Sequence, residues 1–288
     1  MERVKIVGVP EHFNLPWHFA IEEGAFEARG IELVWEDIPQ GTGRMCQMLQ
    51  DKETDLAIVL TEGICKAIYD GVPAKILQEY IGSPLLWGIH VGFNSPYQSM
   101  EDLKGTKAAI SRYGSGSHLM AYVHAKQLGW NTEKLSFELI GTLQGAVDAL
   151  TKGMADYFMW EHFTTKPLVD QKIFRRIEDC TTPWPCFVIT ASQDFIDKKE
   201  GLIPHILEVI NTYTAEFRQI PSIDRTFSNR YDLAIEDIHK WLGITDWSQS
   251  QLESQVVDTI IYTLTDLKLI NAVSYTHLTL PTSSVMGG

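Results

Sequence analysis

The chain has 288 residues, which is enough for two domains or for one domain built from two lobes. Its 44% hydrophobic and 21% charged residues are ordinary globular values and exclude disordered, collagenous and coiled-coil proteins. With 24 Lys and Arg against 37 Asp and Glu, the formal net charge is −13. This charge repels nucleic acid and anionic membrane surfaces, so we expect no nucleic-acid partner. A single pocket can differ in sign from the whole chain, so an anionic small ligand is not excluded.

Targeting and cofactor signals point to a plain cytoplasmic protein. The only apolar run before Pro10 is Ile6–Val9, whereas a secretory signal needs about 7–15 apolar residues. No run approaches the roughly 18 residues of a transmembrane helix, so we expect no membrane insertion. The four cysteines, at positions 46, 65, 180 and 186, lack metal-ligand spacing, and we expect reduced thiols, no metal and no cofactor. A periplasmic location would require an incomplete N-terminus.

The last residues of the chain do not read like an evolved segment. Residues 273–288, VSYTHLTLPTSSVMGG, resemble the translation of a sequencing-library adapter, and the alternative is a genuine polar tail. We therefore expect the native sequence to stop at about Ala272, and we give Tyr275 and His277 no functional weight.

Short β-rich segments alternate with helical patterns over most of the chain. The expected strands are Val4–Val9, Ile31–Trp35, Leu56–Leu60, Lys75–Tyr80, Leu86–Val91, Lys107–Ile110, Phe137–Ile140, Ala155–Trp160 and Cys186–Thr190. The expected helices are Pro16–Ala28, Arg44–Leu49, Ser117–Leu128, Leu143–Leu150, Ile203–Phe217, Pro221–Arg230, Ile235–Leu242 and Gln251–Leu269. Repeated strand–helix–strand units of this length predict parallel sheets with helices on both faces.

Two such cycles followed by helices predict an α/β fold of two doubly wound lobes with a helical C-terminus. The expected first lobe combines residues 1–90 with 184–272, and the second comprises residues 91–183. The chain would cross between lobes near residues 88–92 and 182–186. This layout predicts an interlobe cleft where strand carboxyl ends and helix amino ends converge.

The strongest candidate ligand-binding segment is the loop Ser111–His118, which joins an expected strand to an expected helix. Glycines let the backbone approach a ligand, and the first N–H groups of a helix together with serine hydroxyls form a donor-rich anion site. The loop matches neither the dinucleotide G-x-G-x-x-G pattern nor a phosphate-binding P-loop. The alternative is a simple helix N-cap by Ser115 or Ser117. The candidate ligand-binding residues here are Arg112, Ser115, Gly116, Ser117 and His118.

Two earlier loops also follow expected strands. Thr42 can cap a helix, and Arg44 offers a planar donor fork for carboxylate, sulfonate or phosphate, unless it pairs with Asp51 or Glu53 on the surface. His12 and Asn14 are polar groups set among aromatic residues, as in many small-ligand pockets. A lone histidine in such a position is more often structural than catalytic.

Six further residues are candidates on weaker grounds. Trp160 and Glu161 precede His162, and this group fits a pocket wall, a structural hydrogen bond or an acid/base pair. Because neighbours on a strand point to opposite faces, Glu161 and His162 are not expected to face one substrate together. Trp184 lies between two prolines at an expected rigid crossover and offers a stacking face. Position alone adds Thr61, Glu62 and Trp87. Cys186 reads as a buried apolar cysteine rather than a nucleophile.

Several segments, in this order, resemble the type 2 periplasmic-binding-protein superfamily. They are the first strand with Glu11–Trp17, Thr54–Ile58, Ser99–Gly105, Ser115–His118, and Gly153 with Asp156. Over about residues 4–220, the chain is most similar to solute-binding proteins of ABC transporters for nitrate, sulfonate, taurine and thiamine pyrimidine precursors. This resemblance implies two lobes that close by hinge bending on a small ligand, without chemistry, and an ABC-transporter permease or another protein as partner. Lacking a signal or lipoprotein cysteine, the chain looks like the cytoplasmic members.

Two functions are therefore carried forward. The first is a binding protein for a small anionic or heteroaromatic metabolite, such as a sulfonate, a carboxylate or a pyrimidine-like thiamine precursor, with no catalytic residues. The alternative is a cytoplasmic enzyme on the same scaffold, similar to menaquinone-pathway enzymes that eliminate from or cyclise carboxylated substrates, with His12, His118 or Glu161 as base. A ligand-sensing regulator is a third class, without a dedicated module in the sequence.

Overall fold

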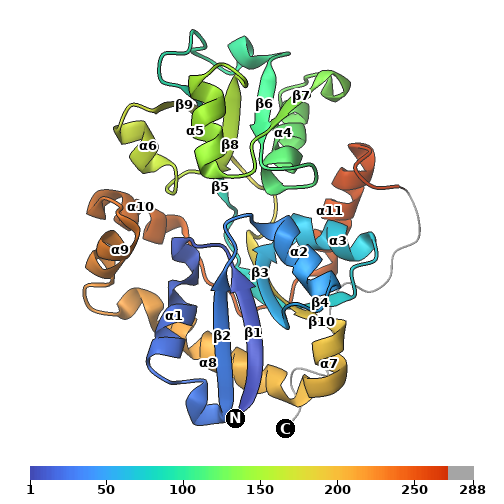
Figure 1. Cartoon of the computed structure of the whole chain (residues 1–288), viewed down its shortest axis with the longest axis vertical. Coiled ribbons are helices and arrows are strands. Elements are labelled where there is room, and N and C mark those ends of the chain that lie inside the picture. The colour runs from blue at the N-terminus through green and yellow to red at the C-terminus, as the bar shows by residue number, and fades with distance from the viewer. Residues whose placement is uncertain (272–288) are drawn as a thin grey trace. The chain divides into compact units, whose positions relative to one another are not determined.

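The computed structural model describes residues 1–271, so the adapter-like tail lies outside the described residues. The chain forms two compact units. Unit 1 contains Met1–Ser83 and Trp184–Tyr262, and unit 2 contains Pro84–Pro183 and Thr263–Asn271 (Figure 1). The chain therefore passes from unit 1 to unit 2 at Pro84, whereas the sequence analysis placed this boundary after residue 90.

Unit 1 is built on a five-stranded sheet in the order β2-β1-β3-β10-β4. Its strands are β1 (Glu2–Gly8), β2 (Ile31–Asp37), β3 (Leu56–Leu60), β4 (Ala74–Ile81) and β10 (Phe187–Ser192). Its helices are α1 (Leu15–Glu22), α2 (Thr42–Gln50), α3 (Thr61–Tyr69), α7 (Gln193–Lys199), α8 (Ile203–Glu216), α9 (Ile223–Tyr231) and α10 (Ile235–Ile244). β1 pairs in parallel with β2 and β3, whereas β10 runs antiparallel to both β3 and β4.

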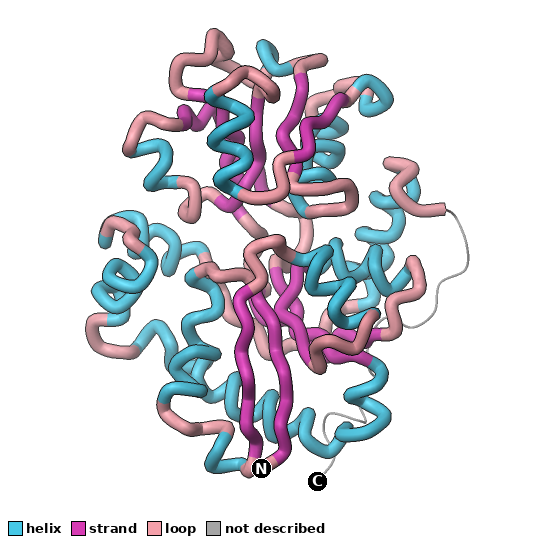
Figure 2. The backbone as a smooth tube through the Cα atoms, viewed as in Figure 1, coloured by secondary structure: helices cyan, strands magenta, loops and turns pink. Residues whose placement is uncertain are grey.

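Unit 2 repeats this plan with the order β7-β6-β8-β5-β9. Its strands are β5 (Leu86–Gly92), β6 (Lys107–Ile110), β7 (Ser136–Leu139), β8 (Tyr157–Glu161) and β9 (Phe174–Thr181). Its helices are α4 (Gly116–Gln127), α5 (Leu143–Thr151) and α6 (Lys166–Asp170), and α11 (Ser254–Asp266) ends in this unit. β6 pairs in parallel with β7 and β8, whereas β5 runs antiparallel to β8 and β9. Figure 2 shows the strands of each sheet and the helices around them.

The two doubly wound units confirm the predicted α/β class, but the expectation of wholly parallel sheets is wrong. In each sheet one strand runs against the other four: β10 in unit 1 and β5 in unit 2. The chain reaches each of these strands through a short crossover between the units and not through a helix. They are therefore free of the connection that forces a strand–helix–strand unit to be parallel.

Some elements differ from their predicted form. The first helix ends at Glu22, and a separate 3₁₀ turn covers Glu27–Arg29 before Gly30, whose φ is 75°. β9 was not predicted because its sequence FRRIEDCT carries charged side chains and lies at a sheet edge, where a strand needs little apolar alternation. The helices α3, α6 and α7 were also missed, and α3 follows β3 without a loop.

The core of unit 2 shows why small residues occupy one helix face. Ala146 and Ala149 of α5 pack with Ala109 of β6 and with Phe158 and Phe174. The alanines let α5 approach the sheet closely, and the helix starts where Thr142 Oγ1 accepts a hydrogen bond from the N–H of Gly145.

We expect Gly145→Ala to lower the free energy of unfolding by about 2 kcal/mol or more. A Cβ atom on Gly145 would clash with the carbonyl oxygen of Ile140, which belongs to the backbone and cannot turn aside. Urea unfolding measures the loss, and Gly201→Ala is the control, because a Cβ there meets nothing within 4 Å. Equal stability of the two variants would contradict this account.

Candidate functional site

The loop Ser111–His118 carries β6 into α4 and is held by its own serines. Ser115 is the N-cap of α4, and its Oγ accepts a hydrogen bond from the N–H of His118 at 3.3 Å. Ser117 Oγ accepts from the N–H of Ser111 at 3.1 Å, and the two hydroxyl oxygens lie 3.1 Å apart. The N-cap alternative is therefore confirmed. Because one hydroxyl donates to the other, these bonds leave one O–H proton of the pair unused.

His118 is oriented by the same loop. The N–H of Gly114 donates to His118 Nδ1 at 3.0 Å, and the rings of Tyr113 and Phe137 meet the imidazole edge-on at 5.3 and 4.8 Å. An Nδ1 that accepts a hydrogen bond carries no proton, so the ring holds its proton on Nε2. His118 is therefore arranged to donate a hydrogen bond, and it lacks the free lone pair that a general base needs.

The loop that begins α5 lies beside this segment and was not recognised in the sequence. Gly141 donates its N–H to the carbonyl of Ser111 at 3.1 Å, which places the start of α5 next to the start of α4. The signal that was overlooked is Thr142, a threonine directly before a helical run.

Glu161 and His162 engage separate partners. Glu161 is buried, and one of its carboxylate oxygens accepts a hydrogen bond from the N–H of Thr164 at 2.6 Å. Burial raises the pKa of Glu161, and hydrogen bonds from the following backbone oppose the rise. His162 lies between Asp179, 2.8 Å from Nδ1, and Arg176, 2.6 Å from Nε2. Both residues thus have the structural hydrogen bonds that the sequence analysis weighed against an acid/base pair.

The two candidate tryptophans of unit 2 differ in their surroundings. Trp160 is half-buried against the unit 2 core and stacks on Phe158 with the ring centroids 5.3 Å apart. Trp87 is buried, and its Nε1 has no hydrogen-bond partner within the described part of the chain.

In unit 1, three segments meet at the end of the sheet where β1 and β3 finish and β10 begins. The N–H of Thr61 donates to the carbonyl of Cys186 at 3.0 Å, and its hydroxyl donates to the carbonyl of Pro185 at 2.6 Å. The ring of Phe13 packs 5.3 Å from the ring of Phe187. These contacts bring the segments that carry His12, Asn14, Thr61, Glu62 and Trp184 to the same end of the sheet.

Glu62, near the start of α3, is fully buried, and only one of its two carboxylate oxygens has a hydrogen-bond partner in the described residues. Trp184 Nε1 donates to Glu62 Oε2 at 2.7 Å, while Oε1 has no partner among residues 1–271. Burial raises the pKa of Glu62 to about 7, and hydrogen bonds from its own backbone N–H and from Trp184 oppose the rise. The sequence placed Glu62 here by position alone; its pairing with Trp184 links residues 122 positions apart.

His12 and Asn14 follow β1 and are also buried. Burial lowers the pKa of His12 to about 3, so its ring is neutral near pH 7. The ring stacks on Phe13 at 4.8 Å and meets Trp241 edge-on at 4.4 Å. Asn14 Nδ2 donates to the carbonyl of Val9 at 2.8 Å. Neither His12 Nε2 nor Asn14 Oδ1 has a partner in the described residues.

The side chains of Thr42 and Arg44, in the loop that begins α2, bind partners within unit 1. Thr42 Oγ1 accepts the N–H of Leu60 at 3.1 Å, and Arg44 pairs with Glu53 at 2.6 Å. Arg44 thus adopts the surface pairing weighed as its alternative. Arg44 and Glu53 also line a shallow surface pocket of about 540 Å³ with Lys5 and Asp37.

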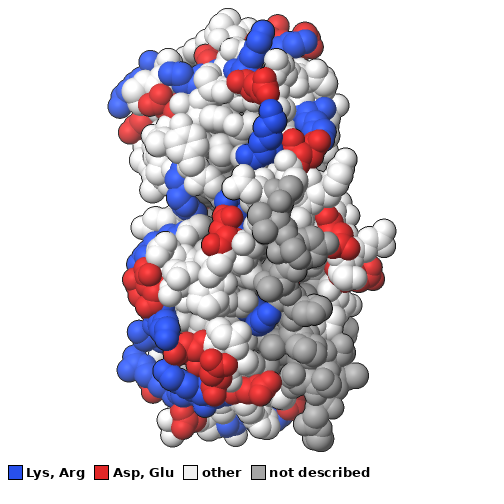
Figure 3. All heavy atoms as spheres, turned by 90° about the vertical axis from the view of Figure 1, so that its right-hand side faces the viewer, with Lys and Arg blue, Asp and Glu red and all other residues white. Residues whose placement is uncertain are grey.

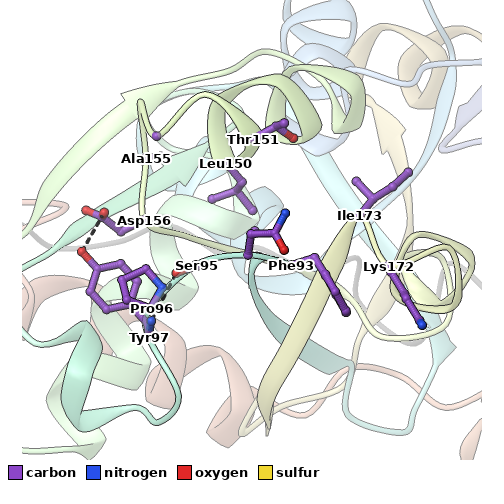
Figure 4. A pocket seen from close by; sticks show the side chains of 13 residues that line it. Phe93, Ser95, Pro96, Tyr97, Leu150, Thr151, Ala155, Asp156, Lys172 and Ile173 are labelled. Atoms are coloured by element: carbon purple, nitrogen blue, oxygen red, sulfur yellow. Dashed lines mark hydrogen bonds between the residues drawn. The ribbon is translucent and has the colours of Figure 1, made fainter.

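A pocket of about 460 Å³ lies elsewhere in unit 2 and contains no predicted site residue. It opens where β5 ends and β8 begins, between the loop after β5 and the turn after α5, at the opposite end of this sheet from Ser111–His118. Figure 4 shows Phe93, Leu150 and Ile173 at its apolar side, with Tyr97 donating to Asp156 at 3.0 Å.

Charge and composition of the described residues limit the kinds of site. Across residues 1–271, no three His, Cys, Asp or Glu side chains are grouped to hold a metal ion. No helix in that range has the length and apolarity to cross a membrane. On the face drawn in Figure 3, basic and acidic side chains are interspersed. All four cysteines are buried, as predicted for Cys186, and no disulfide joins them in the described residues.

Comparisons with known proteins agree with this architecture. Residues 87–180 match the family model described as Ca3427-like PBP. The CA3427 gene product of Candida albicans, which defines a family with the generic periplasmic binding protein fold, superposes with a TM-score of 0.84. It is 26% identical, over 96% of this chain and 92% of that chain. No curated protein sequence matches the chain.

Two sulfonate-binding proteins share the fold at lower identity. The alkanesulfonate-binding protein SsuA of Xanthomonas axonopodis pv. citri, bound to MOPS, has a TM-score of 0.78 and 15% identity over 93% of this chain and 94% of that one. The aliphatic sulphonate binding protein SsuA of Escherichia coli has a TM-score of 0.73 and 19% identity over 94% of each chain. The predicted superfamily is confirmed: the chain has the type 2 periplasmic-binding-protein fold, which supports a ligand-binding protein.

Replacing the N-cap of α4 tests how its loop is held. Ser115→Ala should lower the free energy of unfolding by about 1 kcal/mol, because the N–H of His118 loses its acceptor. Ser115→Gly should cost only a few tenths of a kcal/mol, because glycine at an N-cap leaves the backbone N–H groups open to water. Chemical denaturation of the three proteins measures both values, and an unchanged Ser115→Ala variant would contradict the capping role.

The buried carboxyl of Glu62 should make stability depend on pH. Its folded pKa of about 7 lies above the unfolded value of 4.5, so the folded state holds the proton more tightly. The stabilisation is complete below pH 4.5 and is lost as the pH rises through 7, by about 3 kcal/mol in total.

Urea unfolding between pH 5 and pH 8 measures this slope. Glu62→Gln should flatten the decline, whereas Glu36→Gln, at an exposed glutamate on β2, should leave it unchanged. A slope that is the same in wild type and Glu62→Gln would assign the titration to another group.

Proposed function

We propose that this protein binds a small anionic metabolite, with hinge bending on binding and without catalysing a reaction. The observation that carries the proposal is the loop Ser111–His118. It combines the amino end of a 12-residue helix with the hydroxyl groups of Ser115 and Ser117. Sulfonate, carboxylate and the phosphate of a pyrimidine precursor all accept such hydrogen bonds.

The physical basis is the charge of a helix terminus. The first N–H groups of α4 carry partial positive charge, and a group that accepts from them is stabilised without any full charge in the protein. Arg112 in the same loop adds a guanidinium. This suits an overall acidic chain, because the attraction is local to one loop.

The alkanesulfonate-binding neighbours support a sulfonate as the first compound to test. A neighbour from Methylobacillus flagellatus, named as the sulfonate-binding protein of a putative sulfonate ABC transporter, supports a permease as the protein partner. Two of the three bases named for the enzyme alternative are engaged by the backbone, because His118 Nδ1 and a carboxylate oxygen of Glu161 accept hydrogen bonds from backbone N–H groups. The third, His12, keeps an Nε2 without a partner in the described residues.

Calorimetric titration with butane-1-sulfonate and with MOPS tests the proposal. We expect binding, and a rise in the free energy of unfolding of about 2.7 kcal/mol at a ligand concentration 100 times Kd. Ser117→Ala and Arg112→Gln should each weaken binding about tenfold, because each removes a hydrogen bond to a charged group.

Ser136→Ala is the matched control, since this serine lies exposed at the start of β7. Binding that is unaffected by both loop variants would place the anion elsewhere. Consumption of a bound compound, followed by mass spectrometry, would instead support an enzyme.

A further inference from the structure

The pocket of about 460 Å³ in unit 2 has no part in the proposed anion site. It opens where β5 ends and β8 begins, whereas the loop Ser111–His118 lies at the other end of the same sheet. All of its lining residues fall between Gly92 and Ile173, within unit 2. Its volume lies in the range of about 300–1,000 Å³ that small-molecule sites occupy. The pocket is therefore complete within one unit, and binding there does not require hinge bending.

One wall of the pocket is the loop after β5, which Arg175 of β9 holds in place. The guanidinium group donates to the carbonyls of Ser95 and Tyr97, at 2.8 and 2.5 Å. The N–H of Phe93 donates to the carbonyl of Ile173 at 3.0 Å. A wall fixed by these bonds has its shape before a ligand arrives, which lowers the entropy that binding costs.

The apolar side of this pocket is partly open to water. Figure 4 shows Phe93, Leu150 and Ile173 on this side. Phe93 is 40% exposed, and Met154, the residue after the lining residue Gly153, is 45% exposed. Exposed apolar surface of this kind leaves water when an apolar molecule covers it, which is favourable. The pocket therefore suits a ligand with an apolar body.

Two acceptors of the pocket carry negative charge. The carbonyl oxygen of Leu150 lies against Gly92, where a Cβ atom would come within 2.9 Å of it. Leu150 is in the last turn of α5, where the carbonyls of a helix carry partial negative charge. Asp156 adds a carboxylate that accepts from the hydroxyl of Tyr97 at 3.0 Å and from the N–H of Lys107 at 2.8 Å. Each of its oxygens can accept a further hydrogen bond, so both acceptors favour a positively charged donor.

Lys172 also lines the pocket, but on the side away from the carboxylate. Figure 4 shows Asp156 and Tyr97 at one side of the pocket, and Lys172 with Ile173 at the other. Lys172 is exposed, and a long lysine side chain in such a position keeps its ammonium in water. Water therefore weakens the repulsion between this ammonium and a cation held near Asp156.

We propose that this pocket binds a small organic cation, an ammonium or guanidinium group carried on an apolar body. Asp156 accepts hydrogen bonds from the cationic group, and the carboxyl end of α5 adds partial negative charge to the same cavity. The apolar body covers Phe93, whose ring face also attracts a cation. The formal net charge of −13 attracts cations to the chain as a whole. This inference goes beyond the proposed function, because the site and the sign of the ligand both differ.

Three compounds with one phenylethyl body test the charge preference. They are 2-phenylethylamine, 2-phenylethanol and 3-phenylpropanoate, which end in an ammonium, a hydroxyl and a carboxylate. We expect the amine to bind about tenfold more tightly than the alcohol near pH 7, because a hydrogen bond that involves a charged group is stronger. The carboxylate should bind more weakly than either. Amide chemical shifts of the full chain, followed by NMR during each titration, give the affinities and should change mainly at residues 92–97 and 150–156.

Two variants of lining residues should act differently. Asp156→Asn should reduce the preference for the amine over the alcohol to about one, because the neutral amide removes the charge. Phe93→Ala should weaken the binding of both compounds, since both lose the same apolar surface. Tyr262→Ala is the matched control for Phe93→Ala: this tyrosine on α11 is 71% exposed and lies outside the pocket, so both affinities should stay unchanged.

A substitution at an exposed position covers the case in which Asp156→Asn does not fold. Lys172→Gln should tighten the binding of 2-phenylethylamine about twofold, because it removes a like charge, and should leave 2-phenylethanol unchanged. Lys134→Gln removes the same charge at an exposed lysine outside the pocket, before β7, and should change neither affinity.

Several results would overturn the inference. They are equal affinities of the wild type for amine and alcohol, a preference that survives in Asp156→Asn, chemical-shift changes confined to other residues, and no binding of the amine. The same titration with butane-1-sulfonate present separates the two proposals, because the two ligands should bind together without competition. Loss of sulfonate binding alone would remove the proposed function and leave the cation site standing, and loss of amine binding alone would do the reverse.

Discussion

The insertion of β10 between β3 and β4 is the constraint on which the unit 1 site depends. Phe187 pairs with Leu60 and with Ile81, so the residues before β10 are brought against the residues that follow β3. Trp184 then reaches Glu62, and Cys186 and Pro185 receive both donors of Thr61. If β10 ran parallel to β3, its carboxyl end would lie at this end of the sheet. Trp184, which precedes β10, would then not meet Glu62.

The two units share a topology but differ in what they offer a ligand. In unit 2, serine hydroxyls, a helix terminus and an oriented imidazole N–H form a set of donors around Ser115 and Ser117. In unit 1, the buried Glu62 and Asn14 present acceptors, and Arg44 is paired with Glu53.

Many elements of the fold were predictable because their signals are local. The buried run Leu56–Leu60 and the segment Lys107–Ile110 became strands with the predicted bounds, and the Gly/Ser loop does begin a helix. The hydrogen-bond partners of the candidate site residues were less predictable. His118 is a candidate from sequence, but only the contact with the N–H of Gly114 shows which ring nitrogen bears the proton. The edge strand β9 escaped notice because its charged sequence carries no alternation.

The sequence by itself determined the α/β class, the alternation of strands and helices, and the donor-rich loop at the start of α4, since periodicity and capping act between residues close along the chain. Only the tertiary structure decided that one strand of each sheet runs against the rest. It also decided that Glu62 is buried and half satisfied, because burial and the bond from Trp184 arise between segments 122 residues apart. Such pairings follow from sheet order, which no local pattern encodes.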